Sequence, residues 1–535
     1  MTYRNKPGND FPHRKSSLST AVSRVIAGSL LLAATQAQAL SWQLDNGVVI
    51  DLDTTLSYEA GMRLKEQDAT VLAAGGNPVV AAVTDDGNRN FDKHDLIKNA
   101  VNFNTDLDIQ YGDGGAFFRA RGWYDDVYSD KDLAKAEFQR DGLDKHKSEV
   151  EILDAFVYNM FDMGERSLSL RAGRQVVSWG ESLFIGGGIS SAQSPVDATK
   201  ASAPGVDLKD IFMPVGQVYG EVDLSDSLAM GAYYQWEWEE SRIDAPGAYF
   251  SVLDALGQGV AGDNTDIGLP VRVDKPSDGQ WGVALRYTAE NLNDTEFGFH
   301  YLRYNDFLPA IQLLPPLLGP QVTNQYFEDI DLIGVSAGMV IGDTNVGAEI
   351  SYQDGKAVQL NIPGAFYFAR AKTAQAQVSF IHLFPSSALA DSITLYGEFA
   401  HNRVLSIDDD ATAAAAGVNV GDVASAVAND RSASSAVLRA KFSYFGVAPG
   451  LDMSWTATYR NDFNGRSSIP FTFTEDFEQL ALKADFRYAG GHSFGVSYVN
   501  YLSDVDDIVE EKDSLGLAHL NADRDYVSAY YKYRF

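Results

Sequence analysis

The stretch VNFNTDLDIQY at residues 101–111 decides the fold. Its odd-numbered positions are apolar or aromatic apart from one threonine, and its even-numbered positions are all polar. Successive side chains of a β-strand point to opposite faces, whereas the 3.6-residue period of a helix would mix these two sets. The stretch is therefore predicted to be a strand with one apolar face and one polar face.

The same alternation recurs along the whole chain. Segments with this pattern are 51–64, 116–124, 228–237, 281–287, 438–444, 451–460 and 480–488. Strands of a membrane barrel need one face for lipid and one for the lumen, and aromatic residues at their ends suit the membrane interfaces. A soluble β-protein is the alternative, but it would need a second layer over the aromatic face, and nothing in the sequence supplies one. The pattern predicts an all-β, transmembrane antiparallel β-barrel.

The connections between these segments are of two kinds. Short turns such as Gly112–Gly115, Asp162–Glu165, Gly342–Asp343 and Ala489–Gly491 alternate with long polar loops. Barrels of the outer membrane have short periplasmic turns and long extracellular loops. Counting hairpins across the short turns and adding a strand at each end predicts about 18 strands (16–18), with both termini on the periplasmic side.

The first 39 residues are predicted to be a cleavable signal peptide. Basic residues precede an apolar stretch, 25–34, of about ten residues, whereas a membrane-spanning helix needs about twenty. The sequence Ala37-Gln38-Ala39 provides an A-x-A cleavage site after Ala39. Residues 40–535 are then the exported barrel of a Gram-negative bacterium.

Composition excludes several classes of function. The chain has 535 residues with no cysteine, so disulfides, thiolate metal sites and cysteine nucleophiles are absent. Its 42 Lys and Arg against 73 Asp and Glu give a net charge of −31, which argues against nucleic acid as a partner. The histidines are scattered singly, so we predict no metal site, no cofactor and no catalytic residues.

The last segment of the chain has its own alternation. Val527, Ala529, Tyr531, Tyr533 and the terminal Phe535 share one face. This pattern is similar to the terminal-strand signal that the barrel assembly machinery of the outer membrane reads. We therefore expect that machinery, outer-membrane lipids and lipopolysaccharide to be partners of this protein.

The polar faces of the strands carry charges of both signs, which we expect to line a hydrated lumen because charge facing lipid costs a few kcal/mol near the midplane. Each charge is open to two readings, a lining of the passage or a cross-strand ion pair. The lumen set predicted from the alternation is Arg63, Arg119, Arg121, Arg171, Arg286, Arg439, Lys441, Arg460 and Arg487 with Asp51, Asp53, Glu59, Asp106, Asp108, Glu237, Asp452 and Asp485.

The connection 178–215 is the main candidate for function, because it is far longer than a hairpin requires. Three glycines at 186–188 allow sharp bends, and three prolines stiffen the segment. Trp179 offers contact surface, and Glu181 a carboxylate. The hypothesis is that the loop folds into the barrel as a constriction, together with Arg119, Arg121, Arg171, Arg174, Asp106 and Asp108. An external cap is the alternative.

Two further loops are candidates for binding. The apolar stretch Phe307–Pro320 contains four prolines and could dock a greasy substrate or pack inside the mouth of the barrel. The acidic run from Asp504 to Asp513 could bind divalent cations, although it lacks the spacing of a calcium loop. A solvated loop is the simpler interpretation of the acidic run.

Several stretches resemble a family known only as domain of unknown function 1302, from Pseudomonas-like proteobacteria. They are Asp86–Phe91, Gly122–Asp126, Leu153–Val157, Arg171–Ser182, Pro195–Ala198, Pro204-Gly205, Pro214-Val215, Trp236–Glu239 and Pro246–Ser251. The R-x-G-R-Q-x-x-x-W-G-E run at 171–181 is the most distinctive of them. One departure is His94, where glycine is expected.

The resemblance implies an outer-membrane barrel that is often encoded beside a predicted lipoprotein and an inner-membrane exporter of hydrophobic compounds. It implies no catalytic residues. We therefore expect permeation or transport of small apolar or amphiphilic molecules, with those two proteins as candidate partners. The alternatives are a barrel that docks a partner and, less favoured, a barrel phospholipase or esterase.

Overall fold

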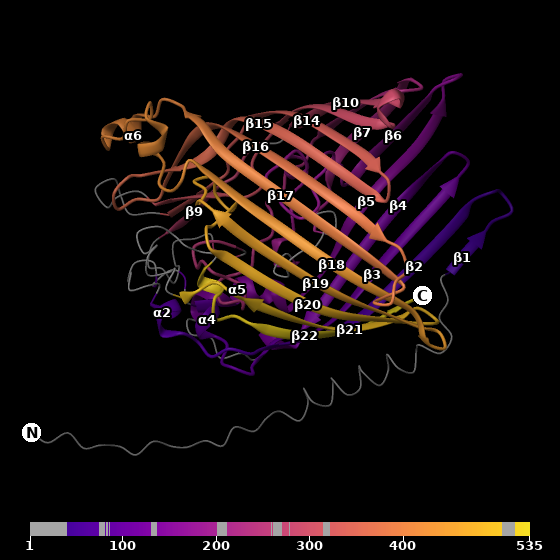
Figure 1. Ribbon diagram of the computed structural model, residues 1–535, viewed down its shortest axis with the longest axis horizontal. Helices are drawn as coiled ribbons and strands as arrows, with labels where there is room; N and C mark the ends of the chain where they lie inside the picture. The colour runs from indigo at the N-terminus through magenta and orange to yellow at the C-terminus, as the bar shows by residue number, and fades with distance from the viewer. Residues whose placement is uncertain are drawn as a thin grey trace, which may run out of the picture.

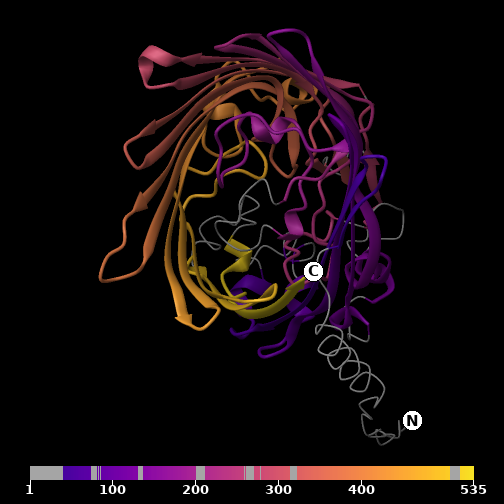
Figure 2. The same cartoon turned by 90° about the vertical axis from the view of Figure 1, so that its right-hand side faces the viewer.

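The computed structural model describes residues 40–73, 81, 84, 86–129, 136–200, 211–257, 259–260, 270–277, 279–313, 322–505 and 519–535. Eighteen strands pair antiparallel with their neighbours, and β22 pairs with β2 to close a barrel (Figures 1 and 2). This confirms the predicted fold class and strand number. The predicted cleavage site at Ala39 lies outside the described residues.

The strands of the barrel are long and regular. They are β2 (Val49–Arg63), β3 (Leu96–Tyr111), β4 (Gly114–Asp125), β5 (Ser148–Asp162), β6 (Ser167–Gln175), β7 (Val215–Ser225), β8 (Leu228–Gln235), β10 (Gln280–Ala289), β11 (Thr295–Tyr304), β14 (Ile330–Ile341), β15 (Thr344–Leu360), β16 (Tyr367–Phe384), β17 (Ser392–Ile407), β18 (Ser432–Ala448), β19 (Leu451–Asn464), β20 (Phe477–Tyr488), β21 (His492–Tyr501) and β22 (Tyr526–Arg534).

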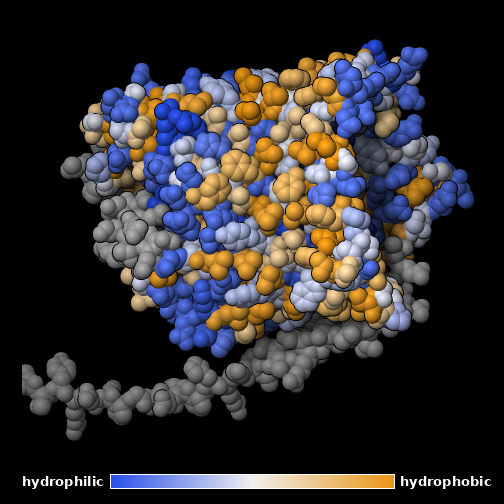
Figure 3. Space-filling view, viewed as in Figure 1, coloured by the Kyte–Doolittle hydropathy of each residue, from blue (hydrophilic) through white to orange (hydrophobic). Residues whose placement is uncertain are grey.

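The outer face of the barrel is apolar in its middle. Large side chains such as Ile152, Phe299 and Ile350 are exposed there, and Figure 3 shows orange residues across the centre of the strands. The alternating inward positions hold polar groups that are buried inside the barrel, among them Glu349 and Glu398. This division between faces is what a β-barrel needs to cross a lipid bilayer. No helix in the described part of the chain is long and apolar enough to span a membrane.

The two ends of the barrel differ in their connections. Eight short turns lie at one end, which we call the short-turn end. The strand β1 (Leu40–Gln43) extends the edge of β2 there, and the terminal Phe535 bonds to the backbone of Thr54 nearby. Figure 1 shows β1 and the C-terminus together at that end. The long-loop end lies opposite.

The long loops contain short elements of their own. A three-stranded sheet forms from β9 (Val271–Asp274), β12 (Ala310–Leu313) and β13 (Val322–Gln325). Within the predicted apolar loop 307–320, Phe307 and Ile311 are buried, and residues 314–320 lie outside the described part. Among the residues described, the α-helices are α2 (Ala69–Leu72), α4 (Asp86–Arg89), α5 (Ala136–Lys147), α6 (Ala411–Ala415) and α7 (Val423–Ala426).

Loops from distant parts of the sequence meet at the long-loop end. The carbonyl oxygens of Tyr249 and Ser251 accept hydrogen bonds from the Arg524 guanidinium at 2.6 and 2.7 Å. A Cβ on Gly87 would lie 2.5 Å from the Ala248 oxygen, so glycine is required at this crossing. The stretches 86–91 and 246–251, both part of the family resemblance, thus pack against each other.

The buried arginine Arg63 ties the same loops to β2. It donates to Asn88 and to the Phe91 carbonyl and forms an ion pair with Asp523 at 3.2 Å. His94, the departure from the family pattern, has a backbone φ of 70°. This left-handed conformation favours glycine, which explains why glycine is expected at the position.

Candidate functional site

The connection between β6 and β7 lies inside the barrel. We call its described residues 176–200 and 211–214 the inner loop. Figure 2, which looks along the barrel, shows magenta loop segments within the ring of strands. The contacts of the inner loop with inward-facing side chains of β15, β16 and β17 fix this position.

Two carboxylates of the barrel wall hold the backbone of the inner loop. Glu398 of β17 accepts hydrogen bonds from the N–H groups of Leu183, Phe184 and Ile185 at 3.1, 2.6 and 2.7 Å. Glu349 of β15 accepts from the N–H groups of Glu181 and Ile189 at 2.7 and 3.0 Å. Buried backbone donors need such partners, so these two side chains position the loop within the lumen.

Amide and hydroxyl side chains of the same wall bind the carbonyl groups of the loop. Gln377, Gln375 and Gln353 donate to the oxygens of Ile185, Gly186 and Gly187 at 2.8, 2.8 and 3.0 Å. The backbone of the loop is therefore satisfied on both its donor and its acceptor side. A Cβ on Gly188 would lie 2.0 Å from Glu349, so the glycine run allows this close approach.

The root of the inner loop packs on an apolar part of the lumen. Trp179 is buried, and its ring lies 5.1 Å from that of Tyr233 and 5.8 Å from that of His300. Ile189 is fully buried in the same cluster as the inward-facing Leu302 of β11. The loop thus fills the lumen along the wall formed by β7 to β17.

The opposite wall, formed by β3 to β6, carries paired charges. Arg119 of β4 makes a bidentate pair with Asp106 of β3 at 2.7 and 2.9 Å. Arg121 binds Asp197 of the inner loop at 2.7 Å and also Glu151 of β5. Cross-strand ion pairs, one of the two readings of the sequence, are therefore what the structure shows for Arg119 and Arg121.

A cavity of about 530 Å³ lies between this charged wall and the inner loop, beside the contact of Arg121 with Asp197. Arg119, Arg121 and Arg171 line it together with apolar residues of β4, β5 and the loop. The Arg171 guanidinium lies 4.8 Å from the ring centre of Tyr219 and 6.0 Å from that of Phe156. Asp108 lies on the same wall and accepts a hydrogen bond from the Tyr158 hydroxyl at 3.0 Å.

The structure does not bring every predicted residue to this cavity. Arg174 alternates with the inward-facing Arg171 and Gln175 and so falls on the other face of β6. It pairs with Glu237 and Glu239 at 2.5 and 3.0 Å. The prediction that Arg174 faces the lumen is therefore wrong, because the two-residue period of the strand places it on the opposite face from Arg171. Glu237 lies beyond the end of β8, so the alternation of that strand does not fix its side.

The remaining predicted residues are placed as follows. Glu181 lies over Gly338 and Gly347, two glycines that pair across β14 and β15. Tyr531 and Tyr533 lie on β22, where they pair with Tyr58 and Leu56 of β2 at the closing seam. Their recognition by the assembly machinery stays a prediction.

Sequence reasoning missed the residues that hold the inner loop. Glu349 and Glu398 fall in strand segments that were not singled out, and Glu151, Asp197 and Arg242 form a charge cluster around Arg121. The signal that the sequence offered for such a residue was a single carboxylate at an inward position of a strand, such as Glu398 in the stretch YGEF at 396–399. Alternation alone could not identify the partner of such a carboxylate.

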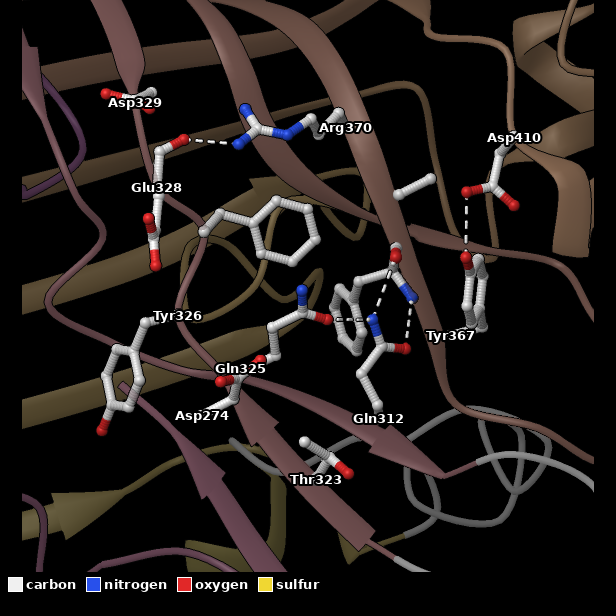
Figure 4. Close-up of a pocket in the computed structure, with 13 residues that line it drawn as sticks. Asp274, Gln312, Thr323, Gln325, Tyr326, Glu328, Asp329, Tyr367, Arg370 and Asp410 are labelled. Carbon is white, nitrogen blue, oxygen red and sulfur yellow. Dashed lines mark hydrogen bonds between the residues drawn. The ribbon is translucent and has the colours of Figure 1, made fainter. Parts of the chain in front are cut away.

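A second cavity, of about 510 Å³, lies at the long-loop end between the small sheet and β16. Figure 4 shows some of its polar side chains bonded to one another or to backbone, such as Arg370 to the Glu328 carbonyl. Gln312 donates to Gln325, and the Tyr367 hydroxyl donates to Asp410 at 2.9 Å. Of the acidic run predicted at Asp504–Asp513, residues 506–513 lie outside the described part, and no group of metal-ligating side chains occurs in the residues described.

Comparison with known proteins places the chain in a family. Among solved structures it is similar to OccAB1 of Acinetobacter baumannii, with 12% identity, a TM-score of 0.44 and 94% of this chain and 99% of that one covered. OpdK of Pseudomonas aeruginosa, solved with vanillate, has 9% identity and a TM-score of 0.41, with 91% and 98% covered. The comparison with curated proteins gave no match. The family model described as protein of unknown function (DUF1302) matches residues 20–535, and the chain therefore belongs to the DUF1302 family.

Proposed function

We propose that this protein is an outer-membrane barrel through which small amphiphilic molecules permeate, with the inner loop as its constriction. The observation that carries the proposal is the loop itself. Its backbone is bonded to Glu349 and Glu398 inside the lumen, and the cavity beside it has both charged and apolar walls. The apolar outer face, the short turns at one end and the long loops at the other suit the bacterial outer membrane.

Conductance of the refolded protein in planar bilayers tests the proposal. Deletion of Gly186–Ala203 removes a large part of the constriction, including Ile189, whose N–H is bound by Glu349, and it should raise the single-channel conductance. A deletion of Gly417–Ser425, in the loop between β17 and β18, leaves the inner loop intact and is the control. Equal conductance of the two deletion variants would contradict a constriction formed by the inner loop.

We also propose partners for the barrel. A periplasmic lipoprotein and an inner-membrane exporter follow from the family resemblance, and lipopolysaccharide from the proposed location. Docking of the barrel to such partners is the alternative function. Copurification of a partner with a barrel that stays closed to ions would favour docking over permeation. A lipid-cleaving barrel is the less favoured alternative. Histidine and serine do meet on neighbouring strands, His401 with Ser434 at 2.9 Å and His300 with Ser336 at 3.3 Å, and hydrolysis of labelled phospholipid that is lost when one of these residues is replaced would favour it.

A further inference from the structure

One of the cations around the inner cavity has no ion pair among the described residues. The described cluster holds five cations and four carboxylates, which are Arg119, Arg121, Arg171, Lys200 and Arg242 with Asp106, Glu151, Asp154 and Asp197. Every cation of the cluster except Arg171 forms an ion pair with one of these carboxylates.

Arg171 is the unmatched cation. Its described contacts are with the rings of Tyr219 and Phe156, and it makes no hydrogen bond or ion pair with the residues that the structure describes. A guanidinium has five N–H donors in a planar fork, and aromatic faces satisfy none of them as an anion would. The two rings instead hold the side chain in place while its donors remain available to the cavity.

The rest of the cavity lining is apolar to a large extent. Phe117 and Leu153 contribute from the barrel wall, and Ile211, Phe212 and Met213 from the inner loop. A volume of about 530 Å³ lies within the range of small-molecule sites. The cavity therefore offers one free cationic group and an apolar surface within reach of each other.

We propose that this cavity is a binding subsite for an apolar or aromatic monocarboxylate, whose carboxylate binds Arg171 and whose body lies on the apolar lining. The inference deepens the proposed permeation of amphiphilic molecules and rests on it. One unmatched guanidinium corresponds to one negative charge. The bidentate geometry of arginine with a carboxylate accounts for the choice of anion.

Equilibrium binding of benzoate to the refolded protein in maltoside micelles tests the subsite, measured by titration calorimetry. Benzamide has the same shape without the charge and is the ligand control. Arg171→Gln should weaken benzoate about tenfold to a hundredfold and leave benzamide unchanged, because a hydrogen-bonded charge pair is lost. Arg171→Lys should restore part of the affinity, since it keeps the charge but not the fork.

Arg460→Gln is the matched protein control. Arg460 lies on β19, outside the lining of this cavity, and its guanidinium is paired with Asp462. An equal loss of benzoate affinity in both variants would show a general field effect and overturn the subsite. Equal affinity of the wild-type protein for benzoate and benzamide, or no binding of benzoate, would also overturn it. Heat-modifiable migration on gels verifies that each variant folds.

The bilayer experiment keeps the two proposals separable. A barrel that binds benzoate through Arg171 but conducts no ions, with or without the inner loop, would retain the subsite and refute permeation. A barrel that conducts ions but binds benzoate equally well with and without the Arg171 guanidinium would retain permeation and refute the subsite.

Discussion

The lumen wall of β15–β17 and the lumen wall of β3–β6 both carry carboxylates, but the two walls use them differently. Glu349 and Glu398 accept hydrogen bonds from the backbone of the inner loop. Asp106 and Glu151 instead pair with arginine side chains of neighbouring strands or loops. A carboxylate bound to main chain fixes a segment in space. The side-chain pairs of the other wall touch the inner loop only through ion pairs such as Arg121 with Asp197, and a cavity remains beside that contact.

This difference predicts different consequences of mutation. Removing an acceptor from buried backbone N–H groups leaves them unsatisfied, at a cost of about 1–3 kcal/mol for each group. Removing one member of a half-exposed ion pair costs about 0–1 kcal/mol but changes the local charge. The first wall should therefore control whether the passage is open, and the second wall which ions or solutes pass.

The largest effect is expected from Glu398→Ala. Three N–H groups, those of Leu183, Phe184 and Ile185, lose their acceptor together. The inner loop should detach from β17, and the single-channel conductance should rise severalfold. Asp485→Ala is the control, because this lumen carboxylate on β20 binds side chains alone. A rise of the same size in the control would show that the wall of β15–β17 has no special role in closing the passage.

A smaller effect of the same kind is expected from Gly347→Val. A Cβ at this position would lie 2.9 Å from the Cβ of Glu181 and 2.8 Å from the Ser379 hydroxyl. Overpacking of this kind costs about 1–3 kcal/mol. The loop should shift without detaching, so the conductance should change less than in Glu398→Ala. Ala348→Val adds similar bulk on the opposite face of β15 and should leave the conductance unchanged.

The barrel could be predicted from sequence because its strands obey one local rule. The stretch 101–111 forms part of β3, and the predicted strand at 451–460 forms part of β19. Lipid and lumen impose the two-residue period on every strand, so the pattern carries the same information many times over. Short turns then fix the neighbours, which is why the strand number could also be counted.

The site could be predicted only in part, because its partners lie far apart in sequence. Glu398 and Phe184 are more than two hundred positions apart, and no local pattern joins them. The role of Arg171 depends on its having no ion pair with a described carboxylate, which only the three-dimensional arrangement reveals. Arg174 shows the converse error, since grouping it with Arg171 by motif ignored the alternation that separates them.

On the charged wall, Arg119→Gln should change selectivity more than stability. Arg119 is 37% exposed and pairs with Asp106, so the loss of stability should stay within about 1 kcal/mol. Asp106 and Asp154 would then face the cavity without this cation, and the reversal potential in a salt gradient should move toward cation preference. Arg303→Gln breaks a similar bidentate pair with Asp331 outside the cavity lining. An equal shift in that variant would show that the cavity does not set selectivity.

The smallest effect is expected at His146, at the end of α5, whose side chain binds main chain. Its Nε2 accepts a hydrogen bond from the Ala245 N–H at 2.9 Å. Burial, reinforced by Lys98, lowers the pKa of His146 to about 4. The contact is therefore fully favourable above the ordinary histidine pKa of about 6.5 and is lost as the pH falls toward 4.

The neighbouring Asp244 has the opposite dependence. Burial, together with the charge of Asp197, raises its pKa to about 7, so the folded loop favours the neutral acid. Its contribution to the stability of the loop is full below the ordinary aspartate pKa of about 3.9 and is lost as the pH rises toward 7.

Hydrogen exchange of the Ala245 amide, corrected for intrinsic rates, should thus show nearly constant protection from pH 7 to 4. In Asp244→Asn protection should fall by about one to two orders of magnitude over that range, and in His146→Gln it should rise. Profiles that match the wild type in both variants would mean that neither group holds this loop, leaving carboxylate-to-backbone bonds as the main-chain anchors of the lumen.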